Sequence, residues 1–131
     1  MFMLDMNICI FLIKNKHEKL IARVIRHDPK DIVISSITVA ELEYGIQKSA
    51  YYEKNKIALI KFLFPFAALP FDTNAAGLYG SVRALLEKRG LPIGPMDLLI
   101  AAHAASLKAT LVTNNTREFA RVPGLKVENW I

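Results

Sequence analysis

The stretch MFMLDMNICIFLIK, residues 1–14, joins a short apolar strand to an apolar helix and places one acidic residue, Asp5, between them. A buried carboxylate without a partner is energetically costly, so such a group shifts its pKa, pairs with another group or holds a cation. Which of these applies to Asp5 depends on the side chains that the rest of the chain brings to the end of that strand.

The composition predicts one folded domain, residues 1–131, because 53% of the residues are hydrophobic and 22% are charged. Cys9 is the only cysteine, which excludes an intrachain disulfide and a four-thiolate metal site and fits a reducing, cytoplasmic compartment. The apolar runs at 1–14 and 57–71 lack the pattern of a signal peptide or a membrane span, so we expect no membrane association. The net charge of +5 is compatible with an anionic partner such as nucleic acid.

Short apolar runs alternate with helical patterns along the whole chain. Strands are expected at residues 2–5, 31–36, 67–71, 109–113 and 125–130. Helices are expected at 7–26 in two pieces, 38–49, 53–64, 74–89 and 95–107, with Gly45 and Gly90 as helix stops and Pro95 as a first helical residue. The alternation predicts an α/β fold in which helices cover both faces of a parallel sheet. In such sheets ligands bind beyond the carboxyl ends of the strands, where the strand order reverses.

Two further acidic residues, Glu41 and Asp97, lie in apolar surroundings near the start of a predicted helix. Each has an ordinary structural explanation. Thr38 and Glu41 match a capping box, in which the glutamate bonds back to the cap backbone. Asp97 lies in the first turn of its helix, where the helix dipole stabilises a negative charge.

The joint placement of Asp5, Glu41 and Asp97 favours a functional interpretation. Three carboxylates about 5 Å apart would repel by roughly 3 kcal/mol per pair at an effective dielectric of 20. A bound cation would offset that repulsion, and the hard ions Mg²⁺ and Mn²⁺ prefer carboxylate and water ligands. The sequence therefore predicts a divalent-cation site at this edge of the sheet.

A fourth segment, ATLVTNNTREF at residues 109–119, ends a strand in polar residues before a helical turn. Thr113, Asn114 and Asn115 are ordinary turn and cap residues. The side-chain carbonyl of Asn115 is also able to ligate an ion or to orient its water.

Four segments, taken in this order, resemble the PIN-domain ribonucleases, and specifically the VapC toxins of bacterial toxin–antitoxin pairs. The segments are LDMNICIFLIKN (4–15), ISSITVAELEYG (34–45), GLPIGPMDLLIAAHA (90–104) and LVTNNTREFARVPGLKVENW (111–130). The resemblance covers the whole chain and implies a small parallel sheet between helical layers, the PIN-like three-layer α/β/α sandwich.

The resemblance also implies an activity and a site. It implies Mg²⁺-dependent RNA cleavage, with Mn²⁺ as a substitute ion, and a catalytic set of Asp5, Glu41, Asp97 and Asn115 in which Asp5 and Asp97 hold the metal. Asn115 stands where many relatives have a fourth aspartate. Met6 stands where the family usually has threonine, so Asp5 is expected to lack a supporting hydroxyl and cleavage is expected to be slower.

The partners implied by the resemblance are an RNA substrate, with tRNA cleaved in the anticodon region, and a VapB-type antitoxin. A homodimer is expected, with DNA contacted only through the antitoxin. Two alternatives remain open: a non-catalytic PIN-like binding protein and, less favoured, a metal-dependent phosphatase or phosphoacceptor domain. The second fits poorly because Asp5-Met6-Asn7 lacks a second aspartate and the late TNN segment lacks a lysine. His103 is interpreted as a packed core residue.

Overall fold

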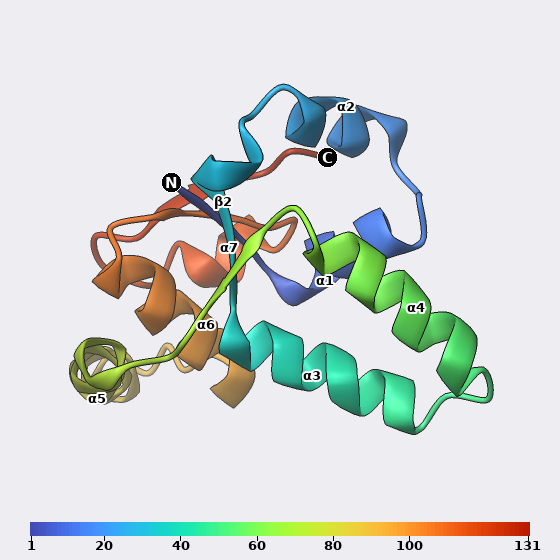
Figure 1. Cartoon of the computed structure of the whole chain (residues 1–131). Coiled ribbons are helices and arrows are strands. Elements are labelled where there is room, and N and C mark those ends of the chain that lie inside the picture. The colour runs from blue at the N-terminus through green and yellow to red at the C-terminus, as the bar shows by residue number, and fades with distance from the viewer.

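Five short parallel strands form the centre of the molecule in the computed structural model, which describes residues 1–131 (Figure 1). The strands are β1 (Phe2–Leu4), β2 (Ile32–Ser35), β3 (Ala67–Leu69), β4 (Thr110–Val112) and β5 (Lys126–Glu128). Their order across the sheet is β3-β2-β1-β4-β5. The chain thus begins in the middle of the sheet, builds outward through β2 and β3, and then returns to place β4 on the other side of β1. The reversal point lies between β1 and β4, where a ligand site is expected.

Helices cover both faces of the sheet, as the alternating pattern predicts. They are α1 (Met6–Ile13), α2 (Glu18–Ile25), α3 (Ser36–Gln47), α4 (Tyr52–Leu63), α5 (Thr73–Lys88), α6 (Pro95–Ser106) and the short α7 (Thr116–Phe119), with a 3₁₀ turn at Pro29–Asp31. One buried cluster joins the sheet to α5, α6 and α7, and a second joins it to α1 to α4. Neighbouring strand residues alternate between them, since Met3 belongs to the first cluster and Leu4 to the second. The three-layer α/β/α sandwich is confirmed.

The expected elements agree with the structure to within a few residues. Gly90 follows α5 with a positive φ of 67°, which a glycine adopts without strain, and Pro95 is the first residue of α6. The helix stop expected at Gly45 is wrong, because α3 continues to Gln47. A helical glycine costs about 1 kcal/mol, which tertiary packing of the same helix outweighs here.

The capping box expected at Thr38 and Glu41 is also wrong. Helix α3 begins earlier, and Ser35 is its N-cap, with the Ser35 hydroxyl accepting a hydrogen bond from the Ile37 N–H at 3.1 Å. Thr38 therefore lies inside the helix, and Glu41 lies too far along it to reach the cap backbone. Of the seven helices, none combines the length and apolar character that crossing a membrane requires.

Candidate active site at the carboxyl edge of the sheet

The site begins where β1 and β4 end side by side. Leu4 pairs with Val112 in the parallel register, and the Asp5 N–H donates to the Val112 carbonyl at 3.1 Å. The next residue of each strand, Asp5 and Thr113, therefore emerges at the same point of the sheet edge. This point is where the strand order reverses.

Asp5 is buried, with only 4% of its surface exposed, and it is the N-cap of α1. Its Oδ1 accepts a hydrogen bond from the Ile8 N–H at 3.0 Å. The Thr113 hydroxyl accepts from the Asn115 N–H at 2.9 Å, which leaves its own proton for the bond to Asp5. Burial raises the pKa of the Asp5 carboxyl, although the bonds from Thr113 and the backbone oppose that rise. The carboxylate is thus held in one orientation while its charge remains incompletely neutralised.

Asp97 faces the same region from the first turn of α6. Burial raises the pKa of its carboxyl, and the negative charges of Glu118 and then Asp5 raise it further. The helix dipole favours the ionised form at this position, but these opposing effects outweigh it. Asp5 and Asp97 therefore approach closely enough to repel each other, as the sequence predicts.

Glu118 is an acidic residue of the site that the sequence reasoning missed. The Asn115 amide nitrogen, Nδ2, donates to Glu118 Oε2 at 2.9 Å, and the Gly94 N–H donates to Glu118 Oε1 at 3.2 Å. These bonds hold the carboxylate beside Asp97 and leave the Asn115 side-chain oxygen unused by Glu118. The signal that could have found Glu118 is its spacing of three residues from Asn115 across the start of α7.

Glu41 comes from a different element, helix α3. It is half-buried on α3, and the charges that raise the pKa of Asp97 come from Glu118 and Asp5 rather than from Glu41. Nowhere in the chain do three or more His, Cys, Asp or Glu side chains gather closely enough to share one metal ion. The structure therefore brings together Asp5, Asp97 and Asn115 of the expected catalytic set and adds Glu118, while the place of Glu41 in that set stays a prediction.

The donor set fits a hydrated divalent cation. Mg²⁺ is usually held by one or two protein carboxylates and keeps several waters, so Asp5 and Asp97 suffice as direct ligands. Burial raises the pKa of both carboxyls, and like charges raise that of Asp97 further. A bound cation would lower both pKa values by stabilising the ionised forms. The Asn115 carbonyl is a further oxygen ligand of the kind that such ions accept.

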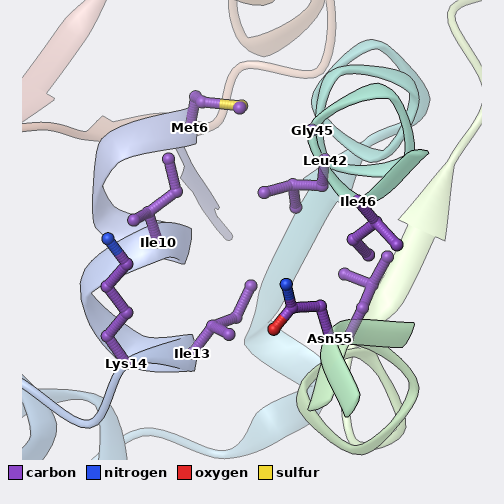
Figure 2. A pocket seen from close by; sticks show the side chains of 9 residues that line it. Met6, Ile10, Ile13, Lys14, Leu42, Gly45, Ile46 and Asn55 are labelled. Carbon is purple, nitrogen blue, oxygen red and sulfur yellow. The ribbon is translucent and has the colours of Figure 1, made fainter. Parts of the chain in front are cut away.

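Met6 follows Asp5 in the chain, but its side chain lines an apolar cavity. This cavity of about 270 Å³ lies between α1, α3 and α4, and it is lined by residues that include Met6, Ile10 and Leu42. Figure 2 shows the Met6 side chain at one end of this cavity, extending toward α3. The side-chain hydroxyl bonded to Asp5 comes from Thr113. The expectation that Asp5 lacks a supporting hydroxyl is therefore wrong, and the slower cleavage expected from Met6 stays a prediction whose size this bond reduces.

His103 is buried in α6, which confirms its interpretation as a packed core residue. Its Nδ1 lies 2.7 Å from the Ser35 hydroxyl. The same hydroxyl also accepts from the Ile37 N–H, so it connects the ring to the first turn of α3. Burial lowers the pKa of His103, and the charge of Asp72 and the backbone of Pro70 oppose that shift. The ring ties α6, which carries Asp97, to the start of α3.

Comparison with known proteins identifies the family of this fold. The family model described as "PIN domain" matches residues 2–125. This chain belongs to the PIN-domain family. It is 46% identical to the tRNA(fMet)-specific endonuclease VapC of Salmonella typhimurium and 46% identical to ribonuclease VapC2 of Rickettsia felis, and each alignment covers 98% of this chain and 97% of the relative.

A solved structure, VapBC2 from Rickettsia felis bound to a DNA fragment from its promoter, superposes on this PIN domain with a TM-score of 0.94. The match has 42% sequence identity and covers 99% of this chain and 98% of that one. The resemblance to VapC proteins is therefore confirmed over the full length of the chain. The four segments that carry it supply every group of the carboxyl-edge site, including Thr113 and Glu118.

Proposed function

We propose that this PIN domain is a divalent-cation-dependent endoribonuclease, the toxin of a VapBC-type toxin–antitoxin pair. The observation that carries the proposal is a pair of carboxylates, the buried Asp5 and the half-buried Asp97, which face each other at the reversal point of the sheet with their pKa values raised. A fold gains nothing in stability from such a pair, whereas a metal site requires it. The VapC names of its relatives agree with this chemistry.

The side chains divide the work as follows. Asp5 and Asp97 hold the ion, and the bonds from Ile8 N–H and Thr113 fix the orientation of Asp5. Asn115 offers its side-chain oxygen to the ion, while its amide nitrogen holds Glu118 in place.

Bound Mg²⁺ or Mn²⁺ would lower the pKa of a coordinated water and stabilise negative charge on the phosphodiester and the departing oxygen. Glu118, held beside Asp97 by two hydrogen bonds, is placed to orient a water or accept its proton. Glu41 is assigned a supporting role from α3, where it positions water at the edge of the site.

We propose tRNA as the substrate, cleaved in the anticodon region. The net charge of +5 favours a polyanion, and the Salmonella relative is named for its action on tRNA(fMet). Initiator tRNA is therefore the first substrate to test.

We propose a VapB-type antitoxin as the protein partner, with the toxin itself a homodimer and DNA contacted only through the antitoxin. The exposed face of α4 supports a protein partner, since Ile57, Ile60 and Phe64 are 52%, 56% and 89% exposed on one stripe. The apolar cavity lined by Met6 lies on the other side of α4, where Asn55 and Leu59 face α1 and α3. The solved relatives include VapBC2 of Rickettsia felis bound to a promoter DNA fragment and DNA-bound VapBC of Salmonella typhimurium.

The test is cleavage of initiator tRNA by the purified protein with Mg²⁺, with Mn²⁺ and with a chelator. Asp5→Asn keeps the helix cap, because asparagine caps as well as aspartate, but it removes the charge. We expect this variant to lose at least about a hundredfold in rate, since removing a direct ligand should exceed the effect of a supporting one.

The matched control is Asp28→Asn, which alters another capping aspartate at the opposite edge of the sheet and should cleave normally. Cleavage that persists in chelator, or in Asp5→Asn, would refute the metal-dependent mechanism. Absence of cleavage in all proteins and all ions would favour the non-catalytic alternative.

A further inference from the structure

Thr38 has the only buried side-chain nitrogen or oxygen in the chain without a hydrogen-bond partner. It is the third residue of α3 and has no exposed surface. A threonine inside a helix commonly bonds to the carbonyl one turn earlier, but Thr38 Oγ1 does not. A buried hydroxyl without a partner is unfavourable, so its presence calls for a ligand that completes it.

The position of Thr38 identifies where that ligand lies. In the parallel register Phe2 pairs with Ile32 and Met3 with Val33, so continuing by two residues places Asp5 opposite Ser35. Helix α3 starts directly after Ser35, and a helical side chain covers the turn that precedes it. Thr38 therefore lies over the carboxyl end of β2, in the strand position next to Asp5.

The polar groups at this edge that could share a ligand with the Thr38 hydroxyl are the carboxylates of Asp5 and Asp97, whose charges repel each other. No direct bond joins Thr38 to either carboxylate, so a bridging molecule is required. Ions such as Mg²⁺ retain several waters when only one or two carboxylates bind them. Those waters need protein partners, and such partners orient them and strengthen metal binding.

We propose that Thr38 is a positioning residue of the metal site, whose hydroxyl holds a water from the hydration shell of the cation bound by Asp5 and Asp97. This inference rests on the proposed function, because it assumes that the carboxylate pair binds a divalent ion. Thr38 then orients that ion from α3, the same helix that carries Glu41 one turn later. The Thr38 hydroxyl, which has no hydrogen-bond partner within the protein, would bond to that water.

The test compares Thr38→Val, which keeps the shape of the side chain and removes the hydroxyl, with Thr38→Ser, which keeps the hydroxyl. Mn²⁺ affinity is measured by calorimetry, and Tm is measured in chelator. We expect Thr38→Val to bind Mn²⁺ about tenfold more weakly and Thr38→Ser to bind nearly as well as the unaltered protein. In chelator, Thr38→Val should melt about 3 °C higher, because an unpaired buried hydroxyl has been removed.

Thr110→Val is the matched control, since Thr110 begins β4 at the opposite edge of the sheet, and its Mn²⁺ affinity should not change. A lower Tm for Thr38→Val in chelator with unchanged Mn²⁺ affinity would mean that the hydroxyl is structural, and would overturn the inference. If the unaltered protein binds Mn²⁺ and Asp97→Asn does not, while Thr38→Val binds normally, the Thr38 inference alone fails. If the unaltered protein binds no Mn²⁺, the metal-dependent function fails and this inference fails with it.

Discussion

Helices α3 and α6 carry two pairs of polar residues that differ in how completely they are hydrogen-bonded. His103 in α6 and Ser35 at the start of α3 bond to each other, and Ser35 also accepts from the backbone of its helix. Asp97 in α6 and Thr38 in α3 have no such arrangement: Asp97 faces the like charge of Asp5, and Thr38 has no partner.

The first pair has a structural role, because its hydrogen bonds are complete, whereas the second pair lacks such bonds and is the candidate for a functional role. Buried polar groups are nearly always hydrogen-bonded in native proteins, so a satisfied pair such as Ser35 and His103 needs no ligand to explain it. Polar groups that are buried without partners, or that face like charges, cost stability, and the proposed cation is the species that would offset that cost at Asp97 and Thr38.

The largest expected effect on stability comes from His103→Ala. The change opens a cavity between α6 and the start of α3 and leaves Ser35 without its partner. We expect the free energy of unfolding to fall by about 2 to 4 kcal/mol, measured by urea denaturation. His103→Gln, which is able to accept the bond from Ser35, should lose less than His103→Ala. Equal losses in the two variants would show that packing alone, rather than the bond, holds the helices together.

A smaller effect is expected in the dependence of stability on pH. Burial lowers the pKa of folded His103 below its ordinary value of 6.5, so the unfolded chain binds the proton more readily. This residue's contribution to stability is therefore complete above about pH 6.5 and is lost as the pH falls below it. Asp5 and Asp97 act in the opposite sense, because their folded pKa values are raised above 3.8 and stability falls as pH rises through them.

Urea denaturation of the metal-free protein from pH 4 to 8 separates the two effects. His103→Gln should remove the loss of stability that accompanies acidification below about pH 6.5, and Asp97→Asn should reduce the opposing loss at higher pH. A His103→Gln profile identical to that of the unaltered protein would show that His103 titrates normally in the fold.

The smallest expected effect is that of Met6→Thr on cleavage. Family resemblance predicts faster cleavage from a restored hydroxyl, but Asp5 already has the Thr113 hydroxyl, and Met6 lines the apolar cavity. We therefore expect less than about a threefold change in rate on tRNA, alongside unchanged Mn²⁺ affinity. A tenfold or greater increase would show that Asp5 lacks support which Thr113 does not supply.

The sequence predicted the elements well because strand and helix periodicity is a local property. Asp5 and Asp97 were also predictable, since the carboxyl ends of parallel strands and the start of a following helix share one edge. Glu118 was missed because its two bonds come from Asn115 and from Gly94, which is 24 residues away in the chain. Its place in the site depends on a loop whose path no local pattern specifies.

Thr38 was misinterpreted for a different reason. The capping-box pattern is genuine in sequence, but α3 begins at Ser36, so Thr38 is inside the helix rather than at its cap. A helix boundary is the least reliable part of any pattern-based prediction. Here a difference of a few residues changed an expected cap residue into a buried residue of the first turn of α3.

The central claim is that the carboxyl-edge site is incomplete in the metal-free protein and is completed by a divalent cation. The most direct test is the Tm of the unaltered protein and of Asp97→Asn, each in chelator and in excess Mn²⁺. In chelator Asp97→Asn should be the more stable by about 0.5 to 2 kcal/mol, because one of the facing like charges is removed. In Mn²⁺ the order should reverse, because only the unaltered protein gains binding free energy from the ion. An unaltered protein that is the more stable in chelator and gains nothing from Mn²⁺ would contradict the account.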